Sequence, residues 1–226
     1  MIRALIFDFN GVLADDDPIH MEAFRQVAEE EGLSFTNEDY LDKYLPLNDR
    51  DCFKLLFEEH SVTLPASKID QLIERKGRNY FRAIEQKTVL FAAAASAVKM
   101  AAARYPLAIA SGARKAEICH ILQQGQLQEC FGAIISAEDV AFGKPNPEPF
   151  LRAHAKLKER DRSLEVSECV AIEDSIGGIQ SAHDAGMKCL AIAHSYGPER
   201  LRREHPEWII NSIADFAPWL EKEVSK

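Results

Sequence analysis

The sequence predicts an α/β protein with a parallel sheet and a separate helical unit inserted after the first strand. In residues 107–193, short apolar runs of strand length alternate with segments of helical pattern. Strands separated by helices of about 10–15 residues are typical of βαβ units, which build parallel sheets. Residues 18–87 contain no segment with a strand pattern, so we expect them to form a helical unit of their own.

The composition is that of a globular protein and excludes several classes. A chain of 226 residues can bury a sizeable core and lies between one domain and two. Its formal net charge of −9 offers no basic field for nucleic acid, and no apolar run reads as a membrane span or signal peptide. The scattered cysteines lack CxxC spacing and indicate reduced thiols. We therefore expect a cytoplasmic monomer with no nucleic-acid or membrane partner.

The first predicted strand is the apolar run that begins at Ala4 and stops at Asp8, and Gly11 then turns the chain out of it. A carboxylate at the C-terminal edge of a buried parallel strand lies where open α/β sheets bind their ligands. The alternative is that Asp8 only caps the turn, because Asp-x-x-Gly is a common turn composition.

The inserted unit is predicted from four segments with a helical apolar stripe. Proline, glycine and capping residues separate them. The predicted helices cover residues 19–31, a segment that begins at 36–39, residues 50–59 and residues 67–84.

The sheet resumes after the inserted unit. We predict strands at 107–110, 133–135, 169–172 and 189–193, with an edge strand at 208–210. Helices are predicted at 92–103, 114–124, 147–157, 178–185 and 214–220.

Three predicted strands end in polar residues of different chemistry: Asp8, Ser111 and the pair Glu173-Asp174. A stiff Gly/Pro loop adds Lys144. Carboxylates could hold Mg²⁺, while a hydroxyl, loop amides and a lysine could hold phosphate oxygens, and a carboxylate can attack phosphorus. Taken singly, Ser111 or the acidic pair could cap a helix and Lys144 could be solvated. Their joint occurrence at strand ends favours phosphoryl transfer.

These residues lie in motifs that resemble the haloacid dehalogenase-like hydrolase superfamily, in its branch of β-phosphoglucomutase-like phosphatases and phosphomutases. The motifs are Asp8-Phe9-Asn10-Gly11-Val12, Ser111-Gly112-Ala113, Lys144-Pro145 and Glu173-Asp174-Ser175. The resemblance covers nearly the whole chain. It implies a Rossmann-like parallel sheet core, residues 1–15 and 90–226, with an inserted helical cap domain, residues 16–89.

The resemblance also implies roles for particular residues. Asp8 would be the nucleophile that becomes an aspartyl phosphate, and Ser111 and Lys144 would hold the transferring phosphate with the loop of Gly112 and Ala113. Mg²⁺ would be bound by Asp8, the backbone carbonyl of Asn10, and Glu173 or Asp174. In the cap, the positions that members of the branch use for the hinge and the substrate correspond to His20, Arg50 and Lys76.

Asn10 departs from the family pattern. Phosphatases and mutases of this branch carry an aspartate there, which protonates the leaving oxygen and then activates the attacking water or alcohol. An amide cannot exchange a proton near neutral pH. The chain could be a slow phosphatase, a phosphatase for acyl or aryl phosphates, a copy in which aspartate has been replaced, or a phosphate-binding protein without turnover.

We therefore expect a Mg²⁺-dependent phosphatase-like hydrolase that acts on a small phosphorylated metabolite such as a sugar phosphate. A phosphomutase is an alternative, although Asn10 cannot deprotonate a second substrate hydroxyl. A dehalogenase would need no metal and usually has tyrosine at position 10. A phosphonate-cleaving enzyme would need a cap lysine, for which Lys43 or Lys54 could be proposed.

Overall fold

The computed structural model describes residues 1–45, 47–85 and 87–224, apart from the side chains of residues 66 and 224. The chain divides into two compact units. One consists of Met1–Asp15 with Val89–Lys226, and the other of Asp16–Thr88. Each unit has its own hydrophobic core.

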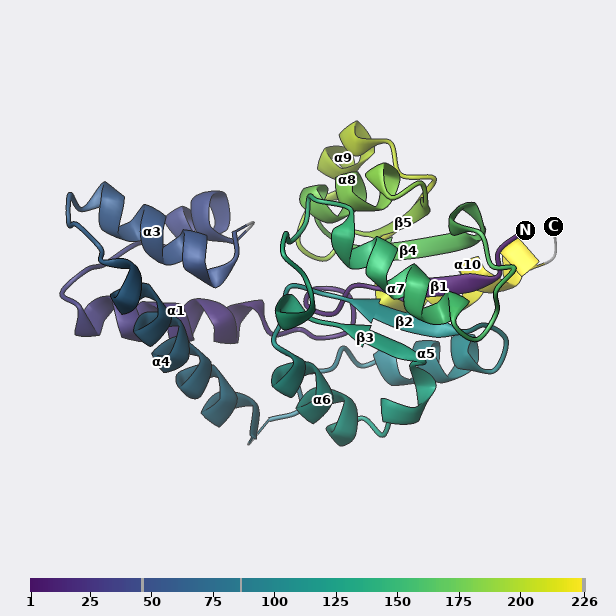
Figure 1. Cartoon of the computed structure of the whole chain (residues 1–226), viewed down its shortest axis with the longest axis horizontal. Coiled ribbons are helices and arrows are strands. Elements are labelled where there is room, and N and C mark those ends of the chain that lie inside the picture. The colour runs from purple at the N-terminus through teal and green to yellow at the C-terminus, as the bar shows by residue number, and fades with distance from the viewer. Residues whose placement is uncertain (46, 86, 225–226) are drawn as a thin grey trace. The chain divides into compact units, whose positions relative to one another are not determined.

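The larger unit is built around one six-stranded sheet in which every strand pair is parallel (Figure 1). The strands are β1 (Ala4–Phe7), β2 (Leu107–Ala110), β3 (Ala133–Ile135), β4 (Cys169–Glu173), β5 (Lys188–Ile192) and β6 (Trp208–Ile210). Their order across the sheet is β3-β2-β1-β4-β5-β6. This is the order of the doubly wound Rossmann sheet, so the predicted fold class is confirmed.

Helices cover both faces of this sheet. They are α5 (Ala94–Ala102), α6 (Lys115–Gln124), α7 (Glu148–Lys158), α8 (Ile176–Asp184), α9 (Pro198–Leu201) and α10 (Phe216–Val224). Phe150 of α7 and Ile179 of α8 share a core cluster with Ile6 of β1. On the other face, the ring of Phe7 packs against Phe216 of α10 with centroids 5.6 Å apart. Burial on both faces explains why β1 is a continuous apolar run.

The strand order brings the predicted site residues to one edge. β1 pairs with β2 on one side and with β4 on the other, at the point where the order of connections reverses. Asp8 follows β1 directly, Ser111 follows β2, and Glu173 is the last residue of β4. In open α/β sheets, ligands bind outside the carboxyl ends of the strands at such a switch point.

The smaller unit is entirely helical in its described residues. Its elements are α1 (Asp17–Glu30), α2 (Asn37–Asp39), the π-helical turn η1 (Tyr40–Tyr44), α3 (Asp49–Glu59) and α4 (Ala66–Glu85). Its core is aromatic, because the ring of Phe24 contacts those of Phe35, Tyr44 and Phe53 at centroid distances of 4.9–5.3 Å. Thr36 and Asp39 form a capping box at the start of α2, which satisfies backbone N–H groups that the helix leaves unpaired.

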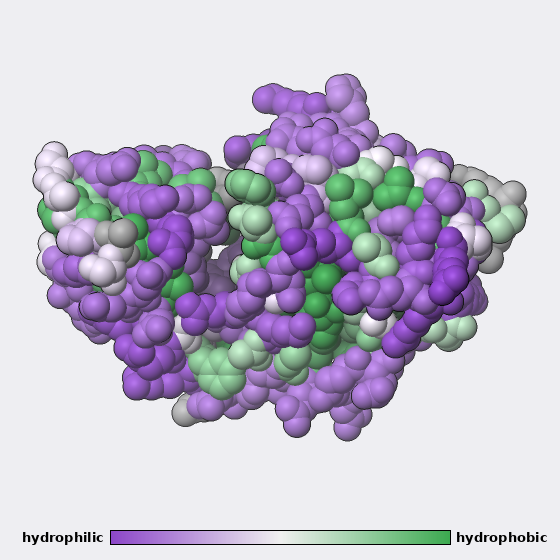
Figure 2. Space-filling model, viewed as in Figure 1, coloured by the Kyte–Doolittle hydropathy of each residue, from purple (hydrophilic) through white to green (hydrophobic). Residues whose placement is uncertain are grey.

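The face seen in Figure 2 is predominantly hydrophilic, and hydrophobic residues show on it as separate patches. Within the described ranges, the large hydrophobic residues that are exposed are Met1, Leu41, Leu47, Val62, Phe142 and Leu151. None of the helices in that part of the chain combines the length and the apolar character needed to cross a bilayer.

Candidate active site

Asp8 lies at the start of a tight loop, residues 8–14, which we call the Asp8 loop. Its backbone N–H donates to Ile172 O of β4 at 2.8 Å, and the N–H groups of Leu13 and Ala14 donate to Phe9 O. Gly11 has φ of +71°, and a Cβ there would lie 2.0 Å from Asp174 Oδ2. Only glycine satisfies both conditions, so the loop can pack directly against Asp174.

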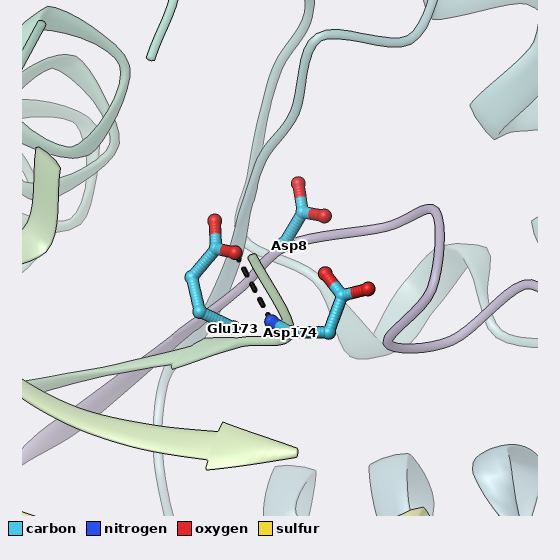
Figure 3. Close-up of side chains that lie close together, drawn as sticks. All are labelled: Asp8, Glu173 and Asp174. Carbon is cyan, nitrogen blue, oxygen red and sulfur yellow. Dashed lines mark hydrogen bonds between the residues drawn. The ribbon is translucent and has the colours of Figure 1, made fainter. Parts of the chain in front are cut away.

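Three carboxylates gather at this sheet edge (Figure 3). Asp8, Glu173 and Asp174 each offer an oxygen within 4.8 Å of the others, and all three residues are buried. One ammonium group, that of Lys144, contacts the cluster. If the three carboxylates and the lysine are all ionised, the cluster keeps a net charge of about −2. Such a buried negative charge favours the binding of a divalent cation.

Lys144 bridges two of the carboxylates. Its Nζ donates to Asp8 Oδ1 at 2.7 Å and makes a second, short contact with Glu173 Oε1. Burial lowers the pKa of Lys144, but the charges of Asp8 and Glu173 outweigh this effect and raise it, so the side chain stays protonated. For the Asp8 carboxyl group, burial has the opposite effect and raises the pKa to about 7, although the charge of Lys144 opposes this shift.

Glu173 is held by the turn that follows it. Its Oε2 accepts a hydrogen bond from the N–H of Asp174 at 3.1 Å (Figure 3). It also accepts from the N–H of Ser175 at 3.3 Å and from Ser175 Oγ at 3.0 Å. Its other oxygen contacts Lys144. Glu173 therefore orients the lysine and the turn. Asp174 is the better candidate of the two for a metal ligand.

The space for the Glu173 carboxylate exists because residue 178 has no side chain. A Cβ on Gly178 would lie 1.9–2.1 Å from the carboxylate atoms, whereas a Cβ on the neighbouring Gly177 would meet nothing closer than 3.9 Å. We expect Gly178→Ala to displace Glu173 and Lys144, to lower the free energy of unfolding by about 1–3 kcal/mol, and to reduce turnover.

Gly177→Ala is the matched control, since it makes the same change one residue earlier in α8. We expect it to stabilise the protein by about 0.5–1 kcal/mol, because alanine is favoured over glycine within helices. Urea unfolding of both variants measures the difference. Equal stability of the two would contradict the close approach of Gly178 to Glu173.

Ser111 is buried beside the Asp8 loop. Its Oγ donates to Asn10 Oδ1 at 3.4 Å and accepts from the N–H of Ala113 at 3.1 Å. Helix α6 begins at Lys115 with Arg114 at its cap position, so the alternative of a helix cap does not apply to Ser111. Gly112 lies between Ser111 and Ala113 in this loop, and a Cβ on Gly112 would meet no atom within 4 Å.

The acidic pair does not cap the next helix either. The cap of α8 is Ser175, whose Oγ accepts from the N–H of Gly178 at 3.0 Å. The carboxylates of Glu173 and Asp174 are thus engaged with side chains and turn amides around the site rather than with the first turn of the helix.

Sequence reasoning missed His194 and Ser195, which follow β5. Ser195 Oγ makes a short hydrogen bond to Asp174 Oδ2, and His194 Nδ1 lies 2.7 Å from Gly11 O. No motif singled these residues out. Their position just after a predicted strand was the available signal, because the ends of parallel strands share one edge.

The predicted cap residues lie within the helical unit. Lys76 is buried, and its Nζ donates to His20 Nδ1 at 2.8 Å and to Asp49 Oδ1 at 2.5 Å. The His20 ring stacks on Tyr80 with centroids 4.1 Å apart. Arg50 lies outside this group and pairs with Asp70 at 2.5 Å on the surface. The structure thus brings His20 and Lys76 together but not Arg50.

The fold and the site define an α/β enzyme class in which a carboxylate, a lysine and an acidic pair meet at the switch point of a parallel sheet. Residues 5–192 match the family model of haloacid dehalogenase-like hydrolases. The chain belongs to this family, and within it to the branch of β-phosphoglucomutase-like phosphatases and phosphomutases.

Relatives of known name agree with this assignment. The chain is 26% identical over 222 residues to the phosphorylated carbohydrates phosphatase of Thermotoga maritima, covering 95% of this chain and 99% of that protein. It is also 26% identical to the fructose-1-phosphate phosphatase YqaB of Escherichia coli, covering 83% and 95%. The crystal structure of β-phosphoglucomutase from Clostridium difficile matches its fold with a TM-score of 0.82 at 20% identity, covering 94% and 92%.

Proposed function

We propose that this hydrolase is a Mg²⁺-dependent phosphatase of small phosphorylated metabolites, with Asp8 as its nucleophile. The observation that carries the proposal is the position of the Asp8 carboxylate. It stands at the end of β1, 2.7 Å from the Lys144 ammonium and within 4.8 Å of two further carboxylates. A buried anion next to a cation and an acidic cluster is suited to attack on a phosphate ester.

The chemistry has two steps. An oxygen of Asp8 attacks phosphorus, forms an acyl phosphate and releases the alcohol, whose oxygen needs a proton. Water then attacks the acyl phosphate, which releases inorganic phosphate and restores the carboxylate. Lys144 and the Ser111 loop hold the phosphate oxygens while charge shifts onto them.

The site fits Mg²⁺, which prefers oxygen ligands and neutralises charge on a transferring phosphoryl group. Asp8 and Asp174 would hold the ion with the backbone carbonyl of Asn10. Glu173 completes the acidic cluster and, through its contacts, fixes Lys144. The charge excess of this cluster over Lys144 supports a divalent rather than a monovalent cation.

Asn10 limits the rate in this proposal. Its side chain lies next to Ser111, where a group that donates and removes protons would be needed. General acid–base catalysis is typically worth about 10²–10⁴-fold, and an amide does not provide it. The hydrolysis rate would fall less for substrates whose leaving group needs no proton, such as aryl or acyl phosphates.

A sugar phosphate is the substrate that we propose. Two of the relatives are named as phosphatases of phosphorylated carbohydrates and of fructose 1-phosphate. In the cap, we propose His20 and Lys76 for the hinge and the substrate, because they form a hydrogen-bonded pair in which the lysine is buried. Arg50 is the weaker candidate, since it lies outside this group and pairs with Asp70 at the surface.

The competing activities have less support. A dehalogenase would leave the buried acidic pair without a use. A phosphonate-cleaving enzyme would need a cap lysine for a Schiff base, but Lys43 pairs with Asp39 and Glu59, and Lys54 pairs with Asp51, all near the surface. A phosphomutase would need proton transfer at a second hydroxyl, which Asn10 does not supply.

The test is phosphate release from a panel of phosphorylated metabolites and from p-nitrophenyl phosphate, with Mg²⁺ and with EDTA. We expect slow turnover that requires Mg²⁺, with sugar monophosphates hydrolysed faster than other alkyl phosphates. Haloacid turnover without metal would overturn the proposal. Phosphate binding without release from any ester would leave the chain as a phosphate-binding protein of this family.

A further inference from the structure

The residues directly after β5 contact the Asp8 loop and Asp174. His194 and Ser195 lie in a bend whose backbone is tied to the sheet, because the N–H of Ala193 donates to Ile210 O at 2.9 Å. All the contacts described below lie within the unit that carries the sheet. This bend therefore joins the end of β5 to the nucleophile side of the site.

His194 is held between two backbone groups. Its Nδ1 lies 2.7 Å from Gly11 O, and its Nε2 accepts from the N–H of Ile213 at 3.3 Å. A carbonyl only accepts and an N–H only donates, so Nδ1 carries the proton and the ring is neutral. The ring also packs on Phe91, with centroids 4.1 Å apart.

The contact with Gly11 O bears on the Asp8 loop as a whole. Gly11 follows Asn10, whose carbonyl is proposed as a metal ligand, and the N–H of Gly11 donates to Ala14 O at 2.8 Å. Phe91 is tied to the same loop, because its N–H donates to Leu13 O at 3.0 Å. His194 thus contacts the Asp8 loop at Gly11, and its ring packs on Phe91, which is hydrogen-bonded to the same loop.

Ser195 also lies close to Gly11. Its hydroxyl donates to Asp174 Oδ2, and a Cβ on Gly11 would lie 3.0 Å from Ser195 Oγ. A hydrogen bond to a ligating carboxylate fixes its orientation, and such partners typically contribute 10–100-fold to metal affinity or activity. His194 and Ser195 thus contact two adjoining parts of the site, the Asp8 loop and the Asp174 carboxylate.

We propose that His194 and Ser195 are positioning residues for this site. His194 holds the Asp8 loop through Gly11 O, and Ser195 orients Asp174. The parts of this inference that concern activity and the metal rest on the proposed Mg²⁺-dependent phosphatase function; the part that concerns the loop does not. Neither residue touches the reacting atoms.

Two amide substitutions separate the contacts of His194. The side-chain amide of Asn has its nitrogen at the place of Nδ1, so His194→Asn can still donate to Gly11 O. The longer side chain of Gln reaches the place of Nε2, so His194→Gln can accept from Ile213 but loses the bond to Gly11. Both substitutions remove the ring that packs on Phe91, which makes them a matched pair.

We expect His194→Asn to lower kcat less than His194→Gln does, because it keeps the bond to Gly11 O. We expect His194→Gln to lower kcat by about 10–100-fold with little change in KM. Hydrogen exchange of the metal-free protein should show faster exchange at Gly11, Leu13 and Ala14 in the Gln variant only. Equal protection of these amides in both variants would overturn the role of His194, and so would an Asn variant as impaired as the Gln variant.

Ser195→Ala tests the second contact without removing a buried ring. Calorimetric titration with Mg²⁺ alone should show affinity reduced by about 10–100-fold, while Ser96→Ala, on α5, should leave it unchanged. Unchanged affinity in Ser195→Ala would overturn the role of Ser195. If the unaltered chain hydrolysed no ester, the proposed function would fail, whereas exchange and titration would still decide this inference.

Discussion

Replacing Asn10 with aspartate is expected to raise the rate of sugar phosphate hydrolysis by about 10²–10⁴-fold. Asn10 lies beside Ser111 in the loop that follows the proposed nucleophile, and a carboxyl group there could protonate the leaving oxygen and then activate water. Steady-state kinetics of Asn10→Asp with Mg²⁺ measures the change. The gain should be smaller with p-nitrophenyl phosphate, because its leaving group departs without needing a proton.

Asn211→Asp is the matched control, since it makes the same chemical change at an exposed residue that follows β6. We expect it to leave the rate unchanged. If Asn10→Asp gained nothing while its fold and its Mg²⁺ affinity stayed intact, proton transfer at position 10 would not be the limiting step. The proposal that Asn10 limits the rate would then be wrong.

Replacing Asp8 with asparagine is expected to abolish hydrolysis, with a loss on the order of 10⁴-fold or more. The amide has nearly the same shape and can still accept from Lys144, but it is not a nucleophile for phosphorus. Asp8→Asn should still fold and should accumulate no phosphorylated protein. Mass measurement after rapid acid quench of the unaltered chain and of Asp8→Asn tests this directly.

Asp184→Asn provides the control for this prediction, because Asp184 is an exposed aspartate at the end of α8. We expect its rate to equal that of the unaltered chain. Residual turnover by Asp8→Asn close to the starting rate would show that water, rather than Asp8, attacks phosphorus. The covalent mechanism would then be wrong even if the chain proved to be a phosphatase.

Periodicity alone predicted much of the fold. The strands β2, β3 and β6 lie at the predicted 107–110, 133–135 and 208–210, whereas β4 ends one residue later than predicted and β5 begins and ends one residue earlier. Buried strands are short continuous apolar runs, so their ends are visible in the sequence. Helix ends were less accurate: α1 begins at Asp17 and α5 at Ala94, because termini depend on caps and on packing with neighbours.

The site was predicted less evenly than the fold. Motif residues identified Asp8, Ser111, Lys144 and the acidic pair as candidates, and the structure brings these residues together at one sheet edge. The sequence could not indicate which of Glu173 and Asp174 is the better candidate for a metal ligand, because both follow the same predicted strand and carry a carboxyl group. Their difference lies in partners distant along the chain, Lys144 for one and Ser195 for the other.

The sequence by itself determined that this is an α/β protein with a helical insertion, and it predicted a functional site where β1 ends. Local apolar pattern and strand order along the chain carry that information. Only the tertiary structure decided that Arg50 pairs with Asp70, that Gly11 and Gly178 leave room for two carboxylates, and that the bend after β5 contacts the Asp8 loop. Such contacts join residues distant along the chain, and no local pattern encodes which of them meet.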